Sequence, residues 1–200
     1  MKDLEIIVTA FQRPNLLRTL LSSLYAQTLS NMNIRVIHDG YDSECKKIVE
    51  AFLGLNTQIE LSYSYTQMRH NDYGHSLRQI GLERSSAEYT LITNDDNYYT
   101  PNFVQEMIGE ARKSESDVVY CDMVHSHIRY DQPNPIGYQA FITKPHINYI
   151  DMGSFIFRTD LGKKVGFKSR SFEADGVFFE ELKNNTERIT KVKKILFVHN

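Results

Sequence analysis

The sequence contains little of what marks secreted, membrane-spanning or nucleic-acid-binding proteins. Only two of its 200 residues are cysteines, Cys45 and Cys121, and their separation matches no metal-ligand spacing. We expect two buried or half-buried free thiols and a reducing compartment. No apolar run approaches the roughly 20 residues that a membrane-spanning helix needs. The N-terminal residues lead straight into a strand pattern, so we expect no signal peptide and a cytoplasmic protein.

An excess of charge of one sign is also missing. The formal net charge at pH 7 is −2, which gives no reason to expect binding to nucleic acid or to an anionic membrane. Hydrophobic residues make up 41% of the chain and charged residues 24%, a composition typical of a packed globular core. The length suits one domain over residues 1–200.

Strand and helix patterns alternate along the first half of the chain. A helix with leucines at helical spacing follows Pro14, and a second helix follows Ser43, which we expect to cap it. A third helix is predicted at 74–85, although Gly81 weakens that prediction. Such alternation predicts a mostly parallel sheet with helices on both faces. The predicted strands of this half are residues 4–11, 33–40, 59–66 and 88–93.

The pattern changes in the second half of the chain. Pro101 opens a predicted helix, and a strand is predicted at 117–124. Residues 125–151 are rich in His, Tyr, Asn and Pro and are long for a plain connection, so we expect a lid or a binding surface there. The remaining predictions are a strand and short helix at 153–166, a helix at 173–185 and a strand at 193–200.

Polar residues follow three of the predicted strands at their carboxyl ends, at 9–13, 38–42 and 94–97. Ligands of open α/β sheets bind beyond the carboxyl ends of the strands, so we expect these segments to share one site. Asp95 and Asp96 are adjacent there and repel each other without a counter-charge. Mg²⁺ or Mn²⁺ would remove the repulsion and could also bind a nucleotide diphosphate. The alternative is a solvated turn, because Asn and Asp favour turns.

Five segments in order resemble family-2 glycosyltransferases with the GT-A fold, over nearly the whole chain except 125–151. The resemblance implies a Rossmann-like three-layer α/β/α sandwich with a mostly parallel central sheet. It further implies a nucleotide-binding half at 1–97 and an acceptor and catalytic half at 98–200. The segments are IIVTAFQRP (6–14), IRVIHDGYDSE (34–44), YGHSLRQIGLERSSAEY (73–89), TNDDNYYTPNFV (93–104) and SFEADGVFFEEL (171–182).

The resemblance implies roles for donor-binding residues. Asp96 would be the direct metal ligand, and Asp95 would hold the ribose or a metal-bound water. Asp39 would accept a hydrogen bond from the N3–H of a uracil. Arg78 would reach the diphosphate or the sugar, because a guanidinium pairs well with phosphate oxygens. The nucleotide pocket would be lined by Thr9, Ala10, Phe11 and Arg13.

Alternatives remain open for several of these residues. Arg13 and Arg78 could be exposed surface charges, and Asp39 could be a plain turn residue. Asp72 could touch the same region as Arg78, but Asp before a helix is more often a cap.

The resemblance also implies the catalytic residues. Asp175 would be the general base, although Ala174 separates it from Glu173 where the family commonly has adjacent acids; the alternative for Asp175 is a helix N-cap. His199 resembles a late-strand metal ligand, an acceptable role for imidazole with Mn²⁺, and the alternative is a frayed terminus. For His125, His127 and His146 no zinc spacing is present, and we expect acceptor contact or plain surface.

Together these features predict a metal-dependent inverting glycosyltransferase with Mn²⁺ or Mg²⁺ as cofactor. We expect a nucleotide diphospho-sugar donor, specifically a UDP-sugar, and a saccharide or other hydroxyl acceptor. One alternative is a catalytically silent nucleotide-sugar-binding module. Another is a sugar-nucleotide pyrophosphorylase, which would carry a Gly-rich basic loop where this chain has AFQRPN (10–15).

Overall fold

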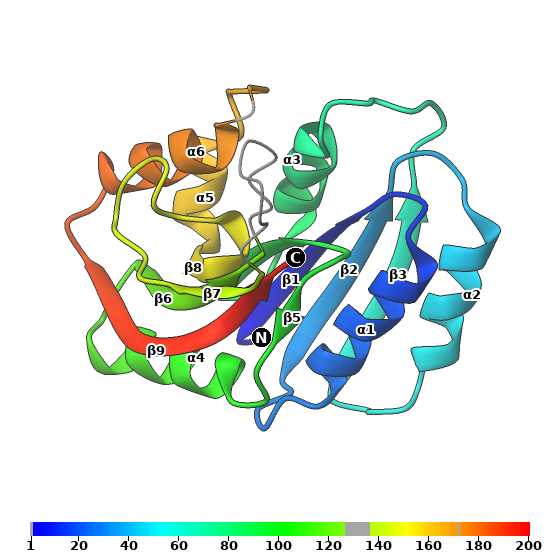
Figure 1. The fold of residues 1–200 in the computed structure, drawn as a ribbon, viewed down its shortest axis with the longest axis horizontal. Helices are drawn as coiled ribbons and strands as arrows, with labels where there is room; N and C mark the ends of the chain where they lie inside the picture. Colours follow the sequence, from blue (N-terminus) through cyan, green and yellow to red (C-terminus); the bar gives the residue numbers. More distant parts are fainter. Residues whose placement is uncertain (1, 127–136, 172) are drawn as a thin grey trace.

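A single nine-stranded sheet runs through the computed structural model, which describes residues 2–126, 137–171 and 173–200 (Figure 1). Its main path has the order β3-β2-β1-β4-β8-β6-β9-β5, and β7 pairs with β6. The strands are β1 (Leu4–Ala10), β2 (Met32–His38), β3 (Ile59–Tyr65), β4 (Tyr89–Asn94), β5 (Tyr98–Tyr99), β6 (Val118–His125), β7 (Gln139–Phe141), β8 (Phe155–Arg158) and β9 (Ile189–His199).

The first four strands are parallel, as predicted. In register, Leu4 of β1 lies between Met32 of β2 and Tyr89 of β4. Every residue of β1 is buried, because this strand lies inside the sheet and both of its faces are covered. In the second half the sheet is mixed: β8 is antiparallel to β4 and β6, whereas β6 and β9 are parallel.

Helices cover both faces of the sheet, which confirms the predicted three-layer sandwich (Figure 1). The helices α1 (Pro14–Tyr25), α2 (Ser43–Phe52) and α4 (Phe103–Lys113) pack on one face. The helices α3 (His75–Arg84), α5 (Thr159–Val165) and α6 (Ala174–Lys183) pack on the other. Cys45 and Cys121 are both free and buried, as expected. None of the helices in the described ranges has the length and apolar character needed to cross a membrane.

Two predicted helix starts differ from the structure. The cap of α2 is Asp42 rather than Ser43, because its Oδ1 accepts the backbone N–H of Cys45 at 2.8 Å. The helix α4 begins at Phe103, two residues after Pro101. Gly81 does not interrupt α3, since a Cβ there would lie 2.5 Å from Cγ2 of Ile7, so the glycine lets the helix pack closely on β1.

Several short or extended elements were not predicted. The last strand starts at Ile189, not at residue 193, because β9 pairs with β6 along its length through a register shift. The two-residue strand β5 forms through pairing of Tyr98 and Tyr99 with β9. Strand β7 lies in the segment expected to be a lid, and a 3₁₀ helix, η1 (Met152–Ser154), precedes β8.

Candidate active site

The carboxyl ends of the parallel strands open into a cavity of about 810 Å³. Both halves of the chain contribute to its wall, including α3, α6 and the end of β9. Asp95 does not line the cavity but lies buried directly behind it, bonded to Phe11 and Arg13. The predicted residues that the cavity brings together are Thr9, Ala10, Phe11, Arg13, Asp39, Arg78, Asp96, Asp175 and His199.

Asp95 and Asp96 share one counter-charge, Arg13. The Nη2 atom of Arg13 lies 2.6 Å from Oδ1 of Asp95, and its Nη1 atom contacts Asp96. The backbone N–H of Phe11 donates to Oδ2 of Asp95 at 2.9 Å. Burial raises the pKa of Asp95 to about 6 even though the Arg13 charge and the Phe11 N–H oppose this rise. The carboxylate oxygens are hard ligands, and a guanidinium of the chain itself stands in as their cation.

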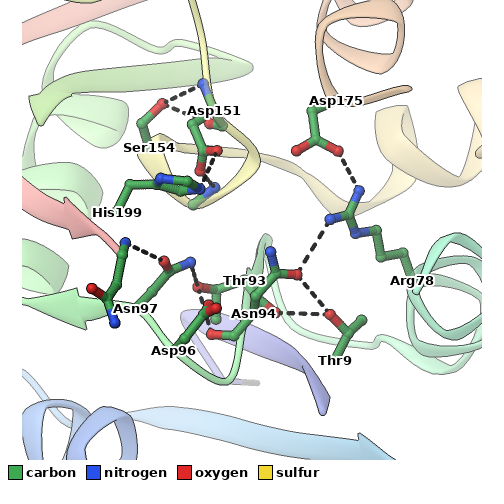
Figure 2. Close-up of polar contacts among 12 residues, drawn as sticks. Thr9, Arg78, Thr93, Asn94, Asp96, Asn97, Asp151, Ser154, Asp175 and His199 are labelled. Carbon is green, nitrogen blue, oxygen red and sulfur yellow. Dashed lines mark hydrogen bonds and ion pairs between the residues drawn. The ribbon is translucent and has the colours of Figure 1, made fainter. Parts of the chain in front are cut away.

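Asn97 fixes the turn that carries the two acids. Its side-chain amide donates to Oγ1 of Thr93 at 3.0 Å, and its Oδ1 accepts the backbone N–H of Asn200 at 3.4 Å (Figure 2). The turn is therefore tied both to its own strand β4 and to the residue after His199. This role was not predicted, because Asn97 and Asn200 lie 103 positions apart in the chain.

Asp39 organises the loop before α3. Its two oxygens accept the backbone N–H groups of His70 at 2.8 Å and Asn71 at 3.0 Å. The guanidinium of Arg69, in the same loop, lies 3.8 Å from the centroid of the Phe11 ring. Asp39, Phe11 and Arg69 all line the cavity, so one end of it offers a guanidinium stacked on an aromatic ring, beside a carboxylate. Arg69 was not identified from the sequence.

The hydrogen bonds and the backbone conformation at the start of α3 set the position of this helix, which bears Arg78. Oδ2 of Asp72 accepts both the backbone N–H of Ser76 at 3.0 Å and its hydroxyl at 2.6 Å, so Asp72 binds the first turn of α3 although the N-cap position itself is Gly74. Gly74 has φ +83°, and a Cβ there would lie 3.3 Å from Cβ of Thr9. Burial lowers the pKa of the neighbouring His75, and the charge of Arg78 lowers it further.

Arg78 is not an exposed surface charge. Its side chain is 4% exposed, and its Nη1 atom donates to Oδ1 of Asp175. Its Nη2 atom donates to Oδ1 of Asn94 at 3.3 Å, and that oxygen also accepts the hydroxyl of Thr9 at 2.8 Å (Figure 2). A continuous set of polar contacts thus runs from β1 to α6.

Asp175 lies in the first turn of α6 and faces the cavity. The N-cap position of α6 is held by Glu173, which makes no side-chain capping bond and also lines the cavity. Asp175 therefore does not act as the N-cap. A Cβ at Gly176 would lie 2.6 Å from Cγ1 of Ile147, so glycine lets α6 approach the segment that carries Ile147.

His199 belongs to the sheet rather than to a loose end. It is in register with His125 of β6, and the two imidazole rings lie 4.2 Å apart between centroids. Nε2 of His199 is 3.3 Å from Oδ2 of Asp151, whose Oδ1 accepts the N–H of Gly153 (Figure 2). Burial raises the pKa of Asp151, and the His199 charge opposes that rise. Asp151 was missed because its segment matched no known motif.

The remaining histidines do not form a zinc site in the described part of the chain. His146 is half exposed and lies 4.0 Å from Glu180, as expected for surface. His127 lies outside the described residues. The side chains of His38, Asp42 and Cys45 come within 4.8 Å of one another. Both ring nitrogens of His38 are already bonded, at 2.9 Å each, to Gly40 O and to the Gln12 N–H, so this cluster is structural.

Two solved structures illustrate the likeness of the fold. TarS of S. aureus (residues 1–349) superposes with a TM-score of 0.78 at 19% identity, over 100% of this chain and 60% of that one. The mannosyltransferase PcManGT of Pyrobaculum calidifontis, solved with GDP-Man and Mn²⁺, has a TM-score of 0.76 at 12% identity, over 98% and 56%. At these identities the likeness shows the GT-A fold alone.

Sequence relatives agree with the fold. An uncharacterized glycosyltransferase of Rickettsia typhi is 24% identical over 207 residues, covering 97% of this chain and 60% of that protein. The chain spans 32% to 60% of the length of the first curated relatives it matches. Residues 5–173 match the family model described as glycosyl transferase family 2. The chain therefore belongs to glycosyltransferase family 2.

Proposed function

We propose that this chain binds a nucleotide diphospho-sugar with a divalent cation and transfers the sugar, with inversion, to a hydroxyl acceptor. The observation that carries the proposal is the shared cavity: Asp96, backed by Asp95, and Asp175 face the same 810 Å³ space. A paired acidic turn alone fits many sites, but its position opposite a second carboxylate on α6 fits sugar transfer.

The donor end of the cavity suits a nucleoside. We infer that the base packs against Phe11 and the Arg69 guanidinium stacked on it, with Asp39 at the edge of the base, and that Thr9 and Ala10 contact the nucleotide. Asp39 can accept a further hydrogen bond besides those from the His70 and Asn71 N–H groups and the Thr66 hydroxyl, because a carboxylate has about four lone-pair sites. TarS has been solved with UDP and UDP-GlcNAc, which supports a UDP-sugar as the donor for this chain.

We infer a divalent cation at the acidic turn, where it would share the carboxylates with Arg13 or displace it. Asp96 would be the direct ligand and His199 a further one, and the buried Asp95 would act through a metal-bound water. Carboxylate oxygens with an imidazole suit Mn²⁺. Arg13 already holds a positive charge against both carboxylates. When bound, the cation would stabilise the departing diphosphate as a Lewis acid.

The proposed reaction is a single displacement. The acceptor oxygen attacks the anomeric carbon from the side opposite the diphosphate, and the carbon–oxygen bond to the diphosphate breaks with both electrons leaving on that oxygen. Asp175 takes the hydroxyl proton as general base, a contribution worth about a hundred- to ten-thousand-fold in rate. Inversion follows because the bond forms on the face opposite the one that breaks.

A donor-turnover assay tests the proposal against a silent binding module. The protein is incubated with UDP-sugars and Mn²⁺, and release of UDP is measured with and without EDTA. We expect slow, metal-dependent hydrolysis of one donor even without acceptor, and the first-formed sugar should have the anomeric configuration opposite to that of the donor. Nucleotide binding without any turnover, across acceptors as well, would favour the binding module.

A further inference from the structure

We propose that Arg78 and Asn94 are positioning residues that fix the carboxylate of Asp175 for proton transfer, rather than contacts to the donor. The inference rests on the proposed function, because it assigns the role of these two residues through the general base. It changes the expectation for Arg78, which the family resemblance placed at the diphosphate or the sugar, and it gives a role to Asn94, for which none was predicted.

Arg78 is buried and makes its contacts with neighbouring side chains. The guanidinium is enclosed, with its side chain 4% exposed, and it donates to Asp175 through Nη1 and to Asn94 through Nη2. Its Nη1 atom also lies 3.3 Å from Nδ1 of His75, so both terminal nitrogens are engaged by neighbouring side chains, and a move of these nitrogens toward a diphosphate would weaken the contact to Asp175. A buried guanidinium in contact with three side chains is suited to orientation, because its planar fork loses little further freedom.

The two carboxylate oxygens of Asp175 have different surroundings. Among the described residues, the Arg78 contact to Oδ1 is the one hydrogen bond that reaches this carboxylate. The other oxygen, Oδ2, is left for the hydroxyl proton of an acceptor, and the side chain is 24% exposed in the cavity wall. One oxygen is anchored while the other stays available, the arrangement that a positioned general base requires.

Asn94 links Arg78 to β1, because its side-chain oxygen accepts hydrogen bonds from two donors. Its Oδ1 accepts the Thr9 hydroxyl at 2.8 Å and Nη2 of Arg78 at 3.3 Å (Figure 2). An amide oxygen holds Arg78 without neutralising it, so the full positive charge remains for Asp175. A carboxylate at position 94 would compete with Asp175 for the same guanidinium.

The test compares Arg78→Gln, Arg78→Lys and Asp175→Asn for kcat, donor KM and UDP affinity. We expect Arg78→Gln to lower kcat by about a hundredfold, as misplacement of a catalytic group does. Its donor KM and UDP affinity should stay within about twofold of the parent, because the donor contacts are untouched. Arg78→Lys should recover part of kcat. Gln79→Ala is the matched control for disturbance of α3, since Gln79 bonds to Phe167 and not to the site.

A double variant gives the sharper reading. In the Asp175→Asn background, Arg78→Gln should lower kcat little further, because residues that act as a unit are strongly non-additive. If loss of the buried guanidinium prevents folding, the variants Asn94→Ala and Asn94→Asp are measured in place of Arg78→Gln. The aspartate variant should lose more kcat than the alanine variant.

Three outcomes overturn the inference while the parent enzyme is active. They are a fall in UDP affinity that matches the fall in kcat, full additivity in the double variant, and unchanged kcat in both Asn94 variants. A parent protein that turns over no nucleotide sugar would instead contradict the proposed function, and the positioning role would fall with it.

Discussion

Nη2 of Arg13 lies 2.6 Å from Oδ1 of Asp95, a carboxylate with no solvent exposure. A buried carboxylate is costly without a partner, and this pair lies at the point where a divalent cation is proposed. The chain therefore supplies its own positive charge to the acidic turn. Any cation that binds Asp95 and Asp96 must share them with Arg13 or displace it.

Arg13→Gln should destabilise the protein in the absence of metal. Loss of the guanidinium leaves Asp95 buried with the Phe11 N–H as its remaining strong donor, and we expect the free energy of unfolding to fall by about 1–3 kcal/mol. Mn²⁺ should raise the melting temperature of this variant more than that of the parent, because the ion no longer competes with Arg13. Thermal unfolding with EDTA or Mn²⁺ measures both effects.

Arg13→Lys is the matched variant for charge. A lysine keeps one positive charge but cannot contact both carboxylates through a planar fork, so it should fall between the parent and the glutamine variant. Equal stability of all three proteins in EDTA would show that Arg13 does not serve as the counter-ion.

Asp175→Asn should separate binding from chemistry. The amide keeps the shape of the side chain but cannot take a proton from the acceptor, so transfer should fall by about a hundred- to ten-thousand-fold. UDP affinity, measured by calorimetry, should stay near the parent value. Glu173→Gln is the control, since Glu173 is the other acid at the start of α6. If that variant lost transfer and Asp175→Asn did not, the two acids would exchange roles.

Two helical glycines should respond oppositely to alanine. A Cβ at Gly81 would lie 2.5 Å from Cγ2 of Ile7, so Gly81→Ala should destabilise by about 1–3 kcal/mol through overpacking. Gly109 of α4 is exposed, with nothing within 4 Å of an added Cβ. Gly109→Ala should stabilise by about 0.5–1 kcal/mol, the difference in helix propensity. Urea unfolding distinguishes the two signs.

The stability of the end opposite the site should depend on pH through Asp117. Burial tends to raise the pKa of Asp117, but hydrogen bonds from Arg188 at 2.5 and 3.0 Å and from Thr186 at 2.5 Å outweigh it and hold the pKa below its ordinary value. A depressed pKa stabilises the fold above the unfolded pKa, and that contribution is lost as pH falls through the folded pKa.

Asp117→Asn should therefore lower the free energy of unfolding by about 1–2 kcal/mol at pH 7. The difference from the parent should shrink as the pH falls below about 4, the ordinary pKa of an aspartate. A difference that grew toward acid pH would contradict the assigned sign. Donor turnover at pH 7 should be unaffected by the change.

Sequence patterns predicted the parts of the site that depend on strand order. Thr9 lies at the carboxyl end of β1, and Asp39 and Asp96 follow β2 and β4; these strands are parallel, so their carboxyl ends meet at one edge of the sheet. Their meeting in a single cavity therefore follows from local patterns alone. The three-layer fold was predictable for the same reason, because the apolar periods of strands and helices alternate.

What the sequence could not show are pairings across long separations. Arg78 lies 97 residues from Asp175, and no local pattern says which carboxylate a buried guanidinium will contact. The Asp151–His199 contact likewise depends on where β9 places its end beside η1. Asp95 was expected at the donor itself, yet its burial behind the turn depends on packing of neighbouring strands rather than on the adjacent acids.

The central claim is that Asp96 binds a divalent cation that in turn holds the donor diphosphate. Calorimetric titration of UDP with Mn²⁺ or with EDTA, on the parent and on Asp96→Ala, tests it most directly. We predict that UDP binds the parent only with Mn²⁺ and that the alanine variant shows no Mn²⁺-dependent binding. Full UDP affinity in Asp96→Ala, or binding by the parent that is indifferent to Mn²⁺, would contradict the account.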